Sequence, residues 1–159
     1  MKFVARLACT LTTAAIVCHV LATAPSTALA AAADEQRSEE YFDEAKEYIA
    51  GGNIKAAIIQ LKNALQNNPD NVAARELLGR IYLRVGNGRA AEKEIRAAIR
   101  RGGDRTALRA LLGRALLLQG RYDDALTAAV DDLGEGAARA EILIIRGQAH
   151  LGLRQFDQS

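Results

Sequence analysis

The sequence predicts an all-α fold in which short helix-turn-helix units stack into a solenoid. The first observation is a repeat of 34 residues, because Gly79, Gly113 and Gly147 stand 34 positions apart. Four further columns keep this spacing: Ala57, Ala91, Ala125 and Ser159; Lys46, Arg80, Arg114 and Gln148; Ile49, Leu83, Leu117 and Leu151; Tyr48, Tyr82, Leu116 and His150. A fixed period between about 20 and 50 residues is typical of solenoids, in which each unit contacts its neighbours.

Composition is the second observation. Only 4% of the 159 residues are aromatic and only two are proline, whereas alanine, leucine, arginine and glutamate are frequent. These residue types favour helices, and alanine lets them pack closely. The length suffices for one domain.

The order of signals inside each unit is the third observation. Apolar side chains recur at helical spacing over residues 78–85, and a glycine-bearing turn follows at 86–88. Glycine suits such a turn because it adopts the left-handed conformation that ends a helix. A second amphipathic segment, such as 56–65, ends at the turn-forming residues 68–71. Each unit is therefore expected to be helix, turn, helix, with the glycine column where two helices cross.

The period divides the chain into three units and a partial fourth. Their ranges are 38–71, 72–105, 106–139 and 140–159. Residues 131–136 are acidic and glycine-rich, so we expect the second helix of the third unit to end early. The fourth unit stops near the start of its second helix, which would leave the aliphatic residues 142–145 uncovered. We therefore expect either the front part of a longer array or an end that pairs with another chain.

The first thirty residues have the order of a secretory signal peptide. Lys2 and Arg6 precede an uncharged apolar run, and Ala28-Leu29-Ala30 offers a small-residue cleavage site. We expect cleavage after Ala30, a polar junction at 31–37, and an exported periplasmic or cell-envelope product without a stable membrane span. The alternative is an uncleaved anchor, because the apolar run approaches the ~18 residues of a membrane helix.

Removal of this leader changes the chemistry of the chain. Cys9 and Cys18 both lie in it, so the mature chain would have no thiol or disulfide. Neither cysteine stands in a good lipidation context, so we expect no lipid anchor. The leader holds two of the 21 basic residues and none of the 19 acidic ones, so 19 of each remain. This balance gives no reason to expect nucleic-acid binding.

The unit pattern resembles the tetratricopeptide repeat over residues 38–159. In that family Leu-Gly and a tyrosine mark the first helix, and alanine, a large apolar residue and alanine mark the second. The second unit matches with Leu78-Gly79, Tyr82, Ala91, Ile95 and Ala98. The third departs at Asp132, where alanine is expected. The resemblance implies a right-handed α-solenoid that binds proteins and is not an enzyme.

Three segments are similar to a narrower family, the tetratricopeptide proteins of the PEP-CTERM/exosortase system. They are residues 48–66, 91–95 and 114–120. This resemblance implies a non-catalytic scaffold of the bacterial envelope, linked to exopolysaccharide export and PEP-CTERM protein sorting. The alternative is a regulatory or substrate-presenting arm of a larger glycan-synthesis or secretion complex.

The tetratricopeptide resemblance also implies a ligand groove lined by the first helix of each unit. Transferring its columns gives a polar ladder of Lys46, Arg80, Arg84, Arg114 and Gln148, beside an apolar stripe of Phe42, Ile49, Leu83, Leu117 and Leu151. Arginine suits carboxylates, so the expected partner is a protein or peptide with acidic groups, or an anionic glycan. The alternative is that these cations pair with Glu76 or Asp43 and that the aliphatic residues complete helix packing.

The mature sequence offers little for catalysis. Its single histidine, His150, shares a column with tyrosine and leucine, so we expect a packing role. Adjacent acids such as Asp123 and Asp124 point apart on a helix and make a poor acid–base pair. We expect no enzyme activity, no cofactor and no metal.

Overall fold

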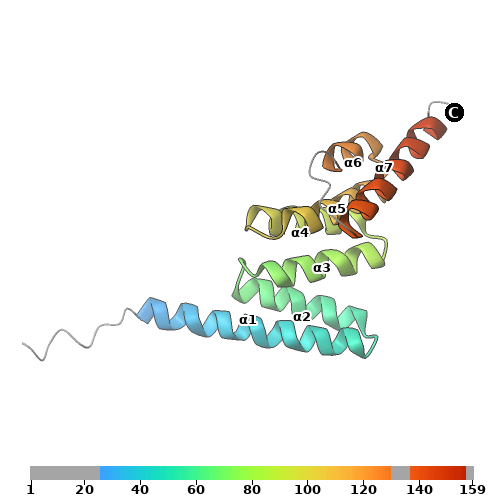
Figure 1. Cartoon of the computed structure of the whole chain (residues 1–159). Helices are drawn as coiled ribbons and strands as arrows, with labels where there is room; N and C mark the ends of the chain where they lie inside the picture. The colour runs from blue at the N-terminus through green and yellow to red at the C-terminus, as the bar shows by residue number, and fades with distance from the viewer. Residues whose placement is uncertain (1–25, 130–136, 157–159) are drawn as a thin grey trace, which may run out of the picture.

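The computed structural model describes residues 26–129 and 137–156, and the regular structure in these residues is entirely α-helical (Figure 1). The helices are α1 (Ser26–Ala50), α2 (Ile54–Asn67), α3 (Val72–Arg84), α4 (Gly88–Arg100), α5 (Arg105–Leu117), α6 (Tyr122–Ala128) and α7 (Ala137–Phe156). The predicted all-α repeat solenoid is confirmed.

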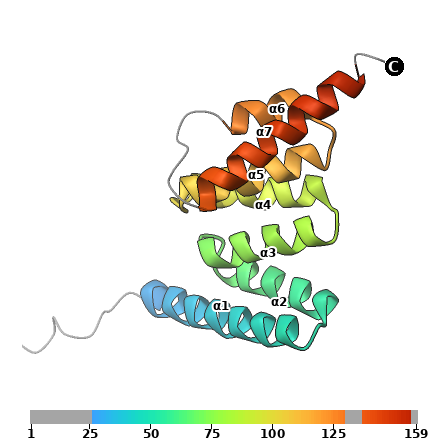
Figure 2. The ribbon, with the colours of Figure 1, turned by 45° about the vertical axis from the view of Figure 1, so that its right-hand side comes forward.

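Each helix packs against the next one along the chain, so the molecule is a stack with two ends (Figures 1 and 2). The α1–α2 pair forms one end, and α6 and α7 form the other. The buried side chains fall into two clusters. The first includes Ala45, Leu61 and Leu78 from α1 to α3, and the second includes Ile95 and Leu116 from α4 to α7. The core is therefore a series of interfaces between neighbours.

The turn between the two helices of each unit contains a glycine with the same backbone conformation. Gly52, Gly86 and Gly120 take positive φ angles of 74°, 77° and 69°, and they stand 34 residues apart. A side chain would be strained in this conformation, which closes the first helix. Asn53 and Asn87 then cap the second helices, since their side-chain oxygens accept hydrogen bonds from backbone N–H groups three residues later.

The N-terminal helix extends beyond its partner. Residues 1–25, which hold most of the expected leader, lie outside the described residues. The expected junction, 31–37, is helical and continuous with α1, which begins at Ser26. Every residue from 28 to 37 is exposed, so this part of α1 projects past α2 (Figure 1). Among the described helices, none has both the length and the hydropathy of a membrane span.

The glycine column marks helix crossings at two of its three positions. A Cβ added to Gly79 would lie 2.8 Å from Cγ1 of Ile95 on α4, and one added to Gly113 would lie 2.9 Å from Cγ2 of Ile145 on α7. These distances are shorter than real Cβ contacts, so both positions require glycine's missing side chain. An added Cβ at Gly147 would meet nothing within 4 Å. The expected crossing is therefore wrong for Gly147 within the described residues.

The short α6 explains why Gly113 meets α7 instead of the second helix of its own unit. As expected, α6 ends early, at Ala128, although residues 131–136 themselves lie outside the described chain. The 34-residue equivalent of Ile95 is Ala129, which is too small to fill the same space. Helix α7 packs directly against α5 and supplies Ile145 in its place.

The expectation that the aliphatic side chains of 142–145 are uncovered is half correct. Ile142 and Ile145 are 2% and 1% exposed because they pack toward α5, so the expectation is wrong for them. Leu143 and Ile144 are 51% and 59% exposed on the opposite side of α7.

Two polar clusters stabilise the stack, one within the second unit and one between the second and third units. Arg75 on α3 pairs with Glu94 on α4 at 2.8 Å, and both side chains are nearly buried. Glu92 on α4 accepts hydrogen bonds from Gln119 and Arg121 at the turn between α5 and α6. Burial raises the pKa of Glu92, but hydrogen bonds from Gln119 and Arg96 and the charge of Arg121 hold that pKa below its ordinary value. A lowered carboxyl pKa adds stability at neutral pH that is lost as the pH falls through it.

Substitution by alanine should affect the free energy of unfolding differently at Gly79, which another helix covers, and at Gly147, which is open. We expect Gly79→Ala to lower the free energy of unfolding by about 1–3 kcal/mol, because Ile95 must move. Gly147→Ala should leave it unchanged or raise it by up to about 1 kcal/mol, because alanine favours an exposed helix. Urea unfolding followed by circular dichroism measures both, and equal effects would contradict the packing described here.

Candidate ligand groove

The first helices of the first two units enclose an apolar hollow. Residues of α1 and α3 line this first hollow, which has a volume of about 430 Å³. Its lining residues are Phe42, Lys46, Ile49, Ala73, Glu76, Leu77 and Arg80. They face one another because residues three and four apart lie on one side of a helix. The floor is apolar, and the three charged side chains are Lys46, Glu76 and Arg80.

A second hollow lies further along the stack. It has a volume of about 390 Å³ and is lined from α3, α5, α7 and the start of α6, together with Leu118, the residue that caps α5. Its lining residues are Leu83, Arg114, Leu117, Leu118, Tyr122 and Gln148. Leu83 and Leu117 are one repeat apart and supply much of its apolar surface. The two hollows together are called the groove below.

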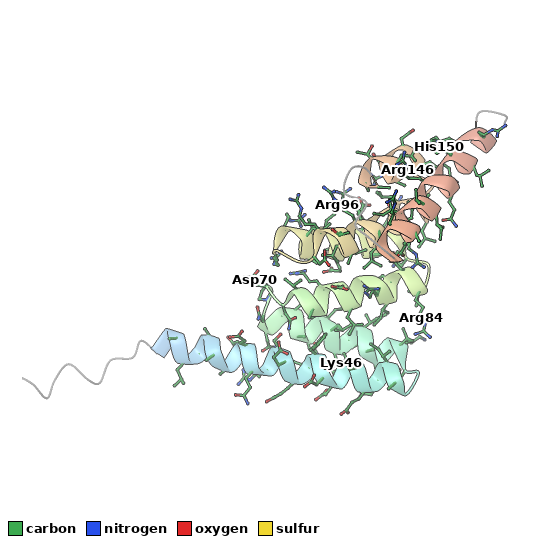
Figure 3. The ribbon with its side chains drawn as sticks, in the orientation of Figure 1. Lys46, Asp70, Arg84, Arg96, Arg146 and His150 are labelled. Carbon is green, nitrogen blue, oxygen red and sulfur yellow. The ribbon has the colours of Figure 1, made fainter. Side chains whose placement is uncertain are left out.

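The structure brings eight of the ten residues predicted for the ligand groove into these two linings. Phe42, Lys46, Ile49 and Arg80 belong to the first hollow; Leu83, Arg114, Leu117 and Gln148 belong to the second. The remaining two lie outside both linings. Arg84 is exposed in the last turn of α3 (Figure 3), and Leu151 is 62% exposed on α7.

Three of the four cations in the predicted ladder, Lys46, Arg80 and Arg114, have a carboxylate beside them. Nζ of Lys46 lies 2.6 Å from Oδ1 of Asp43, and Nη2 of Arg80 lies 2.8 Å from Oε1 of Glu76. The alternative pairing considered from the sequence is therefore present. These pairs are about half exposed, so each contributes only about 0–1 kcal/mol to stability.

The third pair joins two helices. Nη1 of Arg114 on α5 lies 3.2 Å from Oε1 of Glu141 on α7. Sequence periodicity did not indicate this pair, because the two residues are 27 positions apart and the path of α7 depends on the short α6. Lys46, Arg80 and Arg114 are therefore each balanced by a neighbouring carboxylate.

The cations keep some capacity for a ligand. Nε and Nη2 of Arg80 both donate to Glu76, which leaves Nη1 outside that pair. Nζ of Lys46 lies 4.9 Å from the centre of the Phe42 ring, a cation–π distance that holds the ring at the edge of the first hollow. A ligand carboxylate could share these donors without first displacing Asp43 or Glu76.

Five lining residues were not predicted for the groove: Ala73, Glu76, Leu77, Leu118 and Tyr122, of which Glu76 was expected only as an ion-pair partner. Leu77 stands 34 residues before Leu111, which is buried, so its column did not distinguish groove from core. Tyr122 reaches the second hollow because its ring lies against Gly152 of α7, where a Cβ would have no room. Only the three-dimensional path of α7 reveals this contact.

The packing role expected for His150 is wrong. His150 is exposed on α7, because no described helix covers this side of α7 as α4 covers α3 (Figure 3). In the described ranges 26–129 and 137–156, no cluster of three or more histidine, cysteine, aspartate or glutamate residues could hold a metal ion.

Comparisons with known proteins agree with this architecture. Residues 48–112 match the family model of the tetratricopeptide repeat. Among curated proteins, none matches the chain significantly. The first TPR of Spaghetti (RPAP3), solved bound to the HSP90 peptide SRMEEVD, superposes with a TM-score of 0.55 and 17% identity, over 79% of this chain and 96% of that one.

A mutant O-GlcNAc transferase from Thermobaculum terrenum superposes with a TM-score of 0.54 and 23% identity over 75% of this chain. This chain spans only 21% of the length of that transferase. At such identities, both likenesses establish the fold alone.

Proposed function

We propose that this chain, whose tetratricopeptide repeats are supported by the family model and by both solved structures, is an interaction scaffold that binds a peptide segment of a partner protein in its groove. The observation that carries the proposal is the succession of two hollows along the first helices, each with apolar lining residues and at least one charged side chain. Apolar pockets with a few polar groups are the usual form of a ligand site.

The lining indicates the kind of peptide. Phe42, Ile49 and Leu77 offer a surface for one aliphatic or aromatic side chain in the first hollow, and Leu83 and Leu117 offer a second. Because Lys46, Arg80 and Arg114 already have carboxylates beside them, acidic groups of the ligand contribute mainly to orientation and association rate. The expected ligand is an extended peptide with two apolar anchors and acidic residues beside them.

Reversing the ladder tests this assignment. Peptides selected from a random displayed library on the immobilised chain provide the probe. We expect the double variant Arg80→Glu and Arg114→Glu to bind them about tenfold more weakly, a loss of about 1.4 kcal/mol, and with less dependence on salt. Glu76→Gln should strengthen binding of acidic peptides because it releases Arg80.

The matched control is Arg100→Glu, an exposed arginine on α4 outside both linings. All variants should fold, because exposed substitutions usually change stability by only about 0.5 kcal/mol. An affinity that is the same in the double variant and the control would mean that the ladder consists of solvated ion pairs with no role in binding.

We also propose that the scaffold works in the bacterial envelope, within exopolysaccharide export and PEP-CTERM protein sorting. The support is the signal-like order of residues 1–30 and the similarity of residues 48–66 to that protein family. The alternative is an arm of a larger glycan-synthesis or secretion complex, with an anionic glycan as ligand. Exosortase or glycosyltransferase genes beside this one would support the proposal, and their absence would count against it.

The leader gives the direct test of location. We expect the exported protein to begin at Ala31, because Ala28 and Ala30 place small side chains at the two positions that the cleavage site requires. N-terminal sequencing of the periplasmic product measures this, and Ala30→Leu should block the processing. Palmitate incorporation at Cys9 or Cys18 would instead establish a lipid-anchored protein.

A further inference from the structure

We propose that copies of this chain associate head to tail, with the projecting part of α1 of one copy packed on the open face of α7 of the next. The open face is the side of α7 that carries Leu143, Ile144, Gly147 and Leu151. The projecting part of α1 is residues 28–37, which extend past α2. This inference does not depend on the groove or on its ligand.

The open face has the composition of a helix interface. Leu143, Ile144 and Leu151 are 51%, 59% and 62% exposed, and they surround Gly147, where no other described residue comes within 4 Å of an added Cβ. In the two preceding units, the equivalent glycines are covered by an isoleucine of a packed helix. The repeat position that a helix covers at Gly79 and Gly113 is therefore open at Gly147 on α7. A helix from another copy would fit this position in the same way.

Charge selects the kind of helix. Helix α7 carries Arg139, Arg146 and Arg154 against one acid, Glu141, which is already paired with Arg114 on α5. Arg146 and His150 lie on α7 at the end of the stack (Figure 3). A helix that docks on this basic surface is favoured if it is acidic.

Helix α1 has that character. It holds seven acidic and only two basic residues, and its residues 28–37 are exposed throughout. The run 30–33 consists of alanines, which let a neighbouring helix approach closely so that the aliphatic side chains of α7 can fill the contact. Asp34 and Glu35 follow directly and can pair with the arginines of α7. Cleavage after Ala30 would leave this acidic part of α1 in place.

The two surfaces lie at opposite ends of the stack, as both views show (Figures 1 and 2). One copy therefore cannot join its own α1 to its own α7, and a contact between unlike surfaces extends into open chains. A symmetric α7–α7 contact is disfavoured because it would bring the arginines of two copies together. The contact area of one helix is small compared with the about 800 Å² per partner of a stable interface, so the association is concentration-dependent and weakened by salt.

Cysteine cross-linking tests the pairing. In the chain expressed with its own leader, Cys9→Ser and Cys18→Ser leave only introduced cysteines. We expect oxidation of a mixture of Ala32→Cys and Gly147→Cys chains to give a mixed disulfide dimer, at several times the yield of either chain alone and less at high salt. Ile59→Cys, 58% exposed on α2, is the control for random collision.

Dimers of Gly147→Cys chains alone would overturn the proposal in favour of a symmetric contact. Mixed dimers no more abundant than those of the Ile59→Cys control would overturn self-association altogether.

Charge exchange provides the second test. Arg146→Glu with Arg154→Glu in the Gly147→Cys chain should reduce the mixed dimer to the level of the control. Asp34→Lys with Glu35→Lys in the Ala32→Cys chain should restore it, because the two charges then exchange places. All four residues are exposed, so circular dichroism should show unchanged helix content. A yield that charge reversal leaves unchanged would contradict the pairing of α1 with α7.

Discussion

The close approach of helices at Gly79 and Gly113 is the constraint on which the stack depends. At each crossing an isoleucine of a neighbouring helix occupies the space that a Cβ would fill, Ile95 on α4 in one case and Ile145 on α7 in the other. The Gly79 contact sets how closely the two helices of the second unit pack, and the Gly113 contact sets how closely the first helices α5 and α7 pack. The second hollow, which α5 and α7 help to line, depends on the latter contact.

The groove combines local and long-range ion pairs. The Lys46–Asp43 and Arg80–Glu76 pairs each lie within one helix, at spacings of three and four residues, and would form in any arrangement of the units. The Arg114–Glu141 pair exists only because α7 packs on α5. A ligand that draws Arg114 away from Glu141 would therefore also loosen the contact of α7, which links binding in the second hollow to the end of the stack.

The 34-residue periodicity predicted the structural features that recur in every unit. The 34-residue columns were sufficient for the fold class, and they placed side chains such as Lys46 and Arg80 on the same side of successive first helices. The columns could not predict contacts that arise where one unit departs from the repeat. The shortness of α6 moves α7 onto α5, and this single change buries Ile145 and brings Glu141 to Arg114. Gly147 and His150 are exposed for another reason, because no described helix covers that side of α7. Whether a cation pairs with a nearby carboxylate also depends on side-chain rotamers. The spacing of residues alone therefore could not predict which groove cations are paired.

The central claim is that partners bind along the first helices and not on the second. A photoreactive amino acid at Leu77, in the first hollow, tests this against the same amino acid at Ile59, which is exposed on the second helix α2. With peptides selected from a displayed library, the account predicts a cross-linked adduct at position 77 and none at position 59. Adducts of equal yield at both positions, or only at position 59, would contradict it.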